Sequence, residues 1–131
     1  MLLAITVFGG EIKVKDSDPP ILEILEMKPD LAKWRPDMPA FKTDGKPLLT
    51  IRSIRDLIVE ADGKVVTMVL NESDSKKYAE LTRKFQGRLL FYQLSEKPQV
   101  GEVAPANPNQ EGIIAFREAD AAEYLHRLFG K

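Results

Sequence analysis

Proline placement restricts the fold of this 131-residue chain more than any other feature, because six of the nine prolines lie within the first 47 residues. Each proline fixes φ and lacks the N–H group that a helix or an inner strand uses for hydrogen bonding. Residues 1–47 are therefore not expected to hold a long uninterrupted helix or an inner strand. We expect a single domain, 1–131, with a proline-rich strand-and-loop part, 1–47, and a regular part, 48–131.

Three short apolar segments of the proline-rich part favour strands: Leu2–Phe8, Glu11–Lys15 and Ile21–Met27, with a turn at Gly9-Gly10 between the first two. Leu2–Phe8 is far shorter than the ~20 residues of a membrane-spanning helix. It also lacks the basic segment and cleavage site of an export signal. The alternative to a first strand is a trimmed chain whose export signal lay further upstream.

The stretch from Lys28 to Lys46 is interrupted by prolines and reads as an excursion from the sheet. Its large side chains, Trp34, Met38 and Phe41, are expected to pack against the main body. The alternative is an exposed aromatic groove.

The regular part begins with a predicted hairpin. Thr50 and Ser53 can cap a short helical turn. Leu57–Ala61 and Lys64–Leu70 then flank Asp62-Gly63, a dipeptide suited to the positive φ angles of a tight hairpin turn.

A helix is predicted over Glu72–Gln86, because Asn71 is a favourable N-cap and Gly87 follows at the usual C-terminal position. Acidic residues in its first turn and basic residues in its last turn complement the helix dipole. Its apolar stripe, at helical spacing, consists of Tyr78, Leu81 and Phe85.

The remaining segments complete an α+β pattern. They are a strand at Arg88–Leu94, its hairpin partner at Gln99–Val103, a loop at Ala104–Gln110, a strand at Gly112–Phe116 and a helix at Glu118–Phe129 with Ala121, Leu125, Leu128 and Phe129 on one face. Helices separated by hairpin strands indicate an antiparallel or mixed sheet with about two main helices packed on one face.

Composition excludes several kinds of chemistry. The formal net charge is −1, so no general attraction to nucleic acid or anionic lipid is expected. The chain has no cysteine, which excludes disulfides and thiolate sites, and its one histidine, His126, excludes a histidine cluster. His126 lies on the last predicted helix and reads as a surface or partly buried side chain rather than a lone catalytic base. No cofactor is expected.

The acidic residues are scattered, and their convergence into a pocket is the alternative on which an enzyme or small-ligand site would depend. The candidates are Asp16, Asp18, Glu60, Glu102, Glu118 and Asp120. Asp16 and Asp18 resemble the start of a calcium loop, but Pro19-Pro20 replaces its further ligands. Glu118 and Asp120 are explained by the dipole of the last helix. Gly9-Gly10 reads as a turn, because no phosphate-binding motif follows it.

The densest basic run is expected to be a solvated helix face. Its members are Lys76, Lys77, Arg83, Lys84 and Arg88. Glu80 lies four residues from both Lys76 and Lys84, which favours ion pairs within the helix. No stacking aromatic residues are expected between these cations, so a nucleic-acid surface is not favoured.

The segment from Val65 onward resembles the large first periplasmic domain, the head, of SecD in the SecDF protein-export complex. The resemblance is carried by SKKYAELT at 75–82 and GRLL at 87–90, with GKPLLT at 45–50 upstream. Weaker similarity covers Ile21–Met27, Gly112–Phe116 and the last predicted helix.

This resemblance implies a ferredoxin-like head domain outside the cytoplasm that contacts a protein or polypeptide. It implies a non-enzymatic binding or scaffold role, with no membrane insertion by this chain and no catalytic residue carried over. Another interpretation is self-association through the sheet edge near Gln99–Val103.

Overall fold

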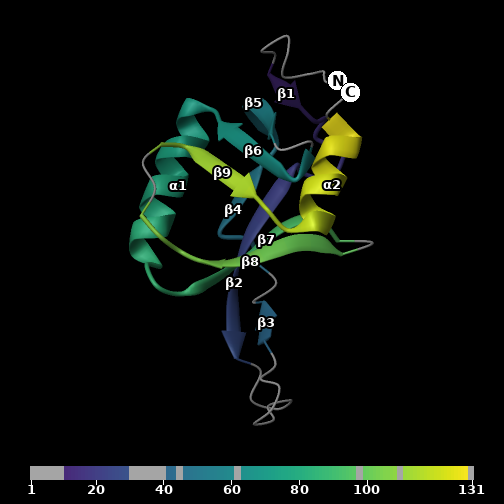
Figure 1. Cartoon of the computed structure of the whole chain (residues 1–131). Helices are drawn as coiled ribbons and strands as arrows, with labels where there is room; N and C mark the ends of the chain where they lie inside the picture. Colours follow the sequence, from purple (N-terminus) through teal and green to yellow (C-terminus); the bar gives the residue numbers. More distant parts are fainter. Residues whose placement is uncertain are drawn as a thin grey trace.

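The computed structural model describes residues 11–29, 41–43, 46–60, 63–96, 99–108 and 111–129 (Figure 1). These residues form an α+β fold with two antiparallel sheets and two helices. The strands are β1 (Ile12–Lys13), β2 (Leu22–Pro29), β3 (Phe41–Thr43), β4 (Leu49–Ile51), β5 (Ser53–Glu60), β6 (Val65–Leu70), β7 (Leu89–Ser95), β8 (Val100–Pro105) and β9 (Ile113–Phe116). The helices are α1 (Glu72–Lys84) and α2 (Ala119–Phe129).

The strands divide between two sheets instead of the single sheet that the sequence predicts. One has the order β1-β5-β6-β9, and the other has the order β3-β2-β7-β8 with β4 also paired to β2. Figure 1 shows α1 and α2 on opposite sides of β9. Each helix contacts both sheets, α1 through β4 and β6 and α2 through β8 and β6. The expectation of helices on one face of one sheet is therefore wrong, because the hairpin strands separate into two layers that the helices bridge.

Arg52 stands where the extended chain passes from one sheet to the other. It is the one residue between β4, which pairs with β2, and β5, which pairs with β6. Its carbonyl accepts the Val14 N–H at 2.9 Å. Its Nη1 donates to the carbonyls of Lys15, at 3.2 Å, and Asp18, at 2.8 Å. The guanidinium therefore holds the loop over residues 15–20, which projects between β1 and β2.

The proline-rich part holds one inner strand after all. Pro19-Pro20 precede β2 and Pro29 ends it, so eight residues lie between interruptions. β2 pairs with β7 on one side and with β3 and β4 on the other. The sequence prediction of a strand at Ile21–Met27 is confirmed, whereas the exclusion of an inner strand is wrong.

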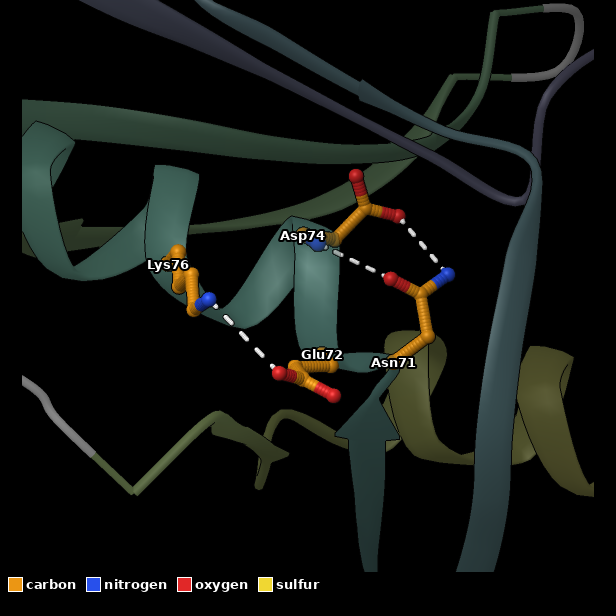
Figure 2. Close-up of polar contacts among 4 residues, drawn as sticks. All are labelled: Asn71, Glu72, Asp74 and Lys76. Carbon is orange, nitrogen blue, oxygen red and sulfur yellow. Dashed lines mark hydrogen bonds and ion pairs between the residues drawn. The ribbon is translucent and has the colours of Figure 1, made fainter.

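The hairpin and the first helix follow the prediction. β5 and β6 pair antiparallel, and Gly63 in their connection has φ of +89°. Asn71 caps α1, because its side-chain oxygen accepts the Asp74 N–H at 2.8 Å (Figure 2). After α1, Gly87 has φ of +83°, as its predicted position requires.

Three local predictions are wrong. Thr50 and Ser53 belong to β4 and β5 rather than to a helical turn. Ala104 and Pro105 belong to β8 rather than to a loop, because an edge strand tolerates a proline that cannot donate to the ladder. Leu128 is 53% exposed instead of lying on the buried face of α2, which consists of Ala121, Ala122 and Leu125.

Several predictions concern residues outside the described ranges. These are the strand Leu2–Phe8, the turn Gly9-Gly10, Asp62 of the hairpin turn, and the packing of the side chains of Trp34, Met38 and Phe41. The backbone of Phe41 is described in β3, which pairs with β2, so residues 41–43 belong to a sheet instead of an excursion from it.

One hydrophobic core joins both sheets and both helices. Its fully buried members include Ile24 of β2, Leu57 of β5, Leu90 of β7, Phe116 of β9 and Leu125 of α2. The core lies between the two sheets, so the passage at Arg52 positions its two halves.

Replacing Arg52 with alanine should lower the free energy of unfolding by about 1 kcal/mol, because two hydrogen bonds to the 15–20 loop are lost at a partly exposed site. Urea unfolding followed by circular dichroism measures this change. Lys77→Ala, an exposed change on α1, is the control and should shift stability by less than about 0.5 kcal/mol. Equal stability of the two variants would contradict the role given to Arg52.

Candidate functional site

A cavity of about 250 Å³ lies between β8 and β9, the strands at which the two described sheets end. We call it the tyrosine pocket. Its polar lining residues are Tyr78, Tyr92, Glu102, Asn107 and Arg117. The residues therefore come from α1, from β7 and β8, and from the segments that follow β8 and β9.

Two buried tyrosines form the inner wall of the tyrosine pocket. The hydroxyl oxygens of Tyr78 and Tyr92 are 2.8 Å apart and share a hydrogen bond. The Tyr92 ring also meets the Phe116 ring edge to face, with centroids 6.4 Å apart. Burial is the main cause that raises the pKa of both hydroxyls. Both stay protonated near neutral pH, so they provide hydrogen bonds and not a general base.

Glu102 carries the carboxylate of the tyrosine pocket. Its Oε1 accepts the Glu118 N–H at 2.6 Å. Glu118 in turn precedes α2, and its carbonyl accepts the Ala122 N–H at 2.9 Å. Glu102 of β8 therefore caps the N-terminus of α2 from a different strand. Burial raises the pKa of Glu102, and the N–H groups of Glu118 and Arg117 oppose this shift.

A larger hollow of about 710 Å³ lies beside the last turns of α2, and we call it the α2 groove. One wall is the 15–20 loop with Pro19 and Pro20, and the other contains Tyr124, Leu128 and Phe129. The remaining lining residues are Val14, Asp18, Ile21, Glu23, Gln93, Leu94, Ser95 and Glu96. The groove combines apolar walls with three carboxylates.

The six acidic candidates from the sequence do not converge. Glu102 lines the tyrosine pocket and Asp18 lines the α2 groove, while the other four line neither. Only Glu102 and Glu118 meet, through a carboxylate and a backbone N–H. Asp16, Glu60 and Asp120 are exposed. Within the described ranges, no group of three or more acidic or histidine residues could hold a metal ion.

The residues of the basic run make more contacts within the protein than the sequence indicates. Lys76 pairs at 3.6 Å with Glu72, four residues before it, whereas the sequence favours Glu80, four residues after it (Figure 2). Arg88 pairs at 2.7 Å with Glu26, whose side chain is buried in β2. The ring of Phe85 lies under both Lys84 and Arg88, so the expectation of no interleaved aromatic residue is wrong. Phe85 packs against the hydrophobic core, so its ring has a structural role and supports these two cations.

His126 lies against the connection of the β5–β6 hairpin. A Cβ atom on Gly63 would stand 2.7 Å from His126 Nδ1, so the imidazole occupies the space that Gly63 leaves open. This contact explains His126 as a packing residue between α2 and the hairpin.

Sequence reasoning missed Glu23, Glu96 and Tyr124 as groove residues. Glu23 and Glu96 lie 73 positions apart and meet only because β2 pairs with β7 (Glu23 opposite Gln93). No local pattern marks them. The sequence does contain a signal for the exposure of Leu128, because this residue falls at the edge of the helical stripe defined by Ala121 and Leu125.

None of the helices in the described part of the chain is long and apolar enough to cross a membrane.

Tyr78→Phe and Tyr92→Phe should each lower the free energy of unfolding by about 1–2 kcal/mol, because each leaves the other buried hydroxyl without its partner. The double variant should cost less than the sum, with a coupling energy of about 1 kcal/mol. Urea unfolding of the four proteins measures this cycle, with Tyr124→Phe as the control. Additive losses would show that the hydroxyls do not depend on one another.

Glu102→Gln should change how stability depends on pH. The pKa of Glu102 is raised in the folded chain, so between the unfolded and folded values the folded state binds more protons. The wild type should therefore lose stability relative to Glu102→Gln as the pH rises from about 4 to about 7. Unfolding curves across this range measure the difference, and Glu60→Gln, an exposed change, is the control. Parallel pH profiles for wild type and Glu102→Gln would contradict the assignment.

Comparison of the chain with protein-family models, with curated proteins and with solved structures gives no match. The resemblance to the SecD head stays a prediction that rests on the residues at 45–50, 75–82 and 87–90.

Proposed function

We propose that this chain is a non-enzymatic domain that binds a polypeptide, similar to the periplasmic head of SecD, and that it acts outside the cytoplasm in connection with protein export. The α2 groove is the observation that carries the binding role, because it is an open hollow with an exposed apolar side chain, Leu128, on its wall. Hollows of a few hundred Å³ with apolar walls and a few polar groups are typical of binding sites.

The block that resembles SecD supports the proposal in its order of elements. Residues 65–95 comprise β6, α1 and β7, as the strand–helix–strand pattern of the family requires. The ferredoxin-like arrangement is not part of the proposal, because β6 and β7 lie in different sheets here.

The polar groups of the tyrosine pocket support a structural role for that pocket. Tyr78 and Tyr92 bond to each other, and Glu102 accepts the N–H that begins α2. Each of these three side chains already has a partner within the protein, whereas an acid–base site needs a group able to exchange a proton with a substrate. The alternative of an enzyme with a carboxylate-lined pocket would need Glu102 to leave its capping position.

Site-specific photocrosslinking tests the binding role. A benzophenone amino acid at Leu128 should crosslink to a permanently unfolded, fluorescent polypeptide, and excess unlabelled polypeptide should abolish the product. The control is the same amino acid at Ile58, an apolar residue on β5 with 41% exposure. No crosslink at Leu128, or equal crosslinks at both positions, would overturn the proposal.

Fractionation of the source cells tests the compartment. The proposal expects the chain in the fraction released when the outer envelope is opened, and recovery with the cytoplasmic proteins would contradict it.

A further inference from the structure

We infer that the α2 groove docks a polypeptide segment that carries a lysine or arginine beside an apolar side chain. This inference rests on the proposed polypeptide-binding function and names the chemistry of the partner. It is argued from the charges, walls and surroundings of the groove.

The charged side chains in the described lining of the groove all carry negative charge. Asp18, Glu23 and Glu96 line it, and its described lining contains no lysine or arginine. The three carboxylates come from the 15–20 loop, from β2 and from the residue after β7. A cationic side chain would therefore find an acidic group on more than one side of the groove.

The end of α2 adds to this negative potential. Tyr124, Leu128 and Phe129 of the groove wall belong to its last turns, and the helix ends at Phe129. The C-terminal end of a helix carries a partial negative charge from its unpaired carbonyls. This end favours the same cationic partner as the carboxylates do.

Two arginines contact residues that line the groove, and each does so at an uncharged group. Arg52 donates to the backbone carbonyls of Lys15 and Asp18. Arg127 lies over the ring of Tyr124, 5.9 Å from its centroid. Gln93 donates to Glu23 at 3.4 Å, which is a neutral partner and leaves the charge of that carboxylate in place.

The apolar walls specify the second half of the partner. Leu128 is 53% exposed, and Pro19 and Pro20 face the groove from the other wall. Removing such apolar surface from water stabilises a complex. A lysine or arginine next to a leucine or phenylalanine satisfies both the carboxylates and these walls, and the aliphatic stem of the cation adds contact area. We therefore commit to a basic, apolar polypeptide segment as the occupant.

Fluorescence anisotropy with the full chain tests the inference. The probe is a short labelled peptide with a Lys-Leu-Phe-Lys centre flanked by Gly and Ser. Two matched probes replace both lysines by glutamate, or both apolar residues by serine. The lysine peptide should bind tightest and should weaken as salt is added, since exposed ion pairs are screened.

Variants locate the site. The double variant Asp18→Asn with Glu96→Gln should weaken the lysine peptide by about two- to thirty-fold, as expected for two exposed ion pairs. Leu128→Ser should also weaken it. The matched control, Glu60→Gln with Glu80→Gln, removes the same charge from exposed positions outside the groove and should leave the affinity unchanged. Circular dichroism melting checks that each variant is folded.

The outcomes separate this inference from the proposed function. If lysine and glutamate peptides bind equally, or if the groove variants bind like the control, the inference is overturned while polypeptide binding stands. If no peptide binds and Leu128 forms no crosslink, both are overturned. If sedimentation shows a dimer that Leu128→Ser dissociates, the groove is filled by a second copy of the chain and the inference is overturned.

Discussion

The change of strand partner at Arg52 is the constraint on which the two-sheet arrangement depends. At Arg52 the strand partner of the chain changes from β2 to β1 and β6. The Arg52 guanidinium also holds the loop over residues 15–20 by donating to two of its carbonyls. The core between the sheets and one wall of the α2 groove both follow from this change of partner.

The edge strands β8 and β9 of the two sheets are joined by side-chain contacts and not by strand pairing. Tyr78, Tyr92 and Phe116 contact one another in sequence across α1, β7 and β9. Glu102 connects β8 to the start of α2. These contacts replace the backbone pairing that would close β8 onto β9, and they leave the tyrosine pocket between those strands. The polar side chains of Tyr78, Tyr92 and Glu102 are therefore accounted for by contacts that join the two sheets and the helices.

Local sequence patterns predict the elements of this fold well, and their arrangement poorly. Asn71 and Gly87 mark the ends of α1 because capping depends on neighbouring residues. The division into two sheets follows from strand pairings between distant segments, such as β2 with β4 and β7, so no local period reveals it. The same reason hides the groove: Asp18 is recognisable as acidic, but Glu23 and Glu96 join it only through strand pairing. Helical spacing places Leu128 at the edge of the stripe of α2, but it does not show that the 15–20 loop forms the opposite wall of the groove.

The loop over residues 15–20 interrupts the pairing between β1–β2 and β4–β5 without changing its direction. Val14 bonds to the carbonyl of Arg52 just before the loop, and Ile21 bonds to the carbonyl of Ile51 just after it. Register on either side is thus set by residues that the loop does not contain. Because Arg52 binds backbone carbonyls of this loop, the side chains of residues 15–20 can change while the loop stays attached and the sheets keep their register.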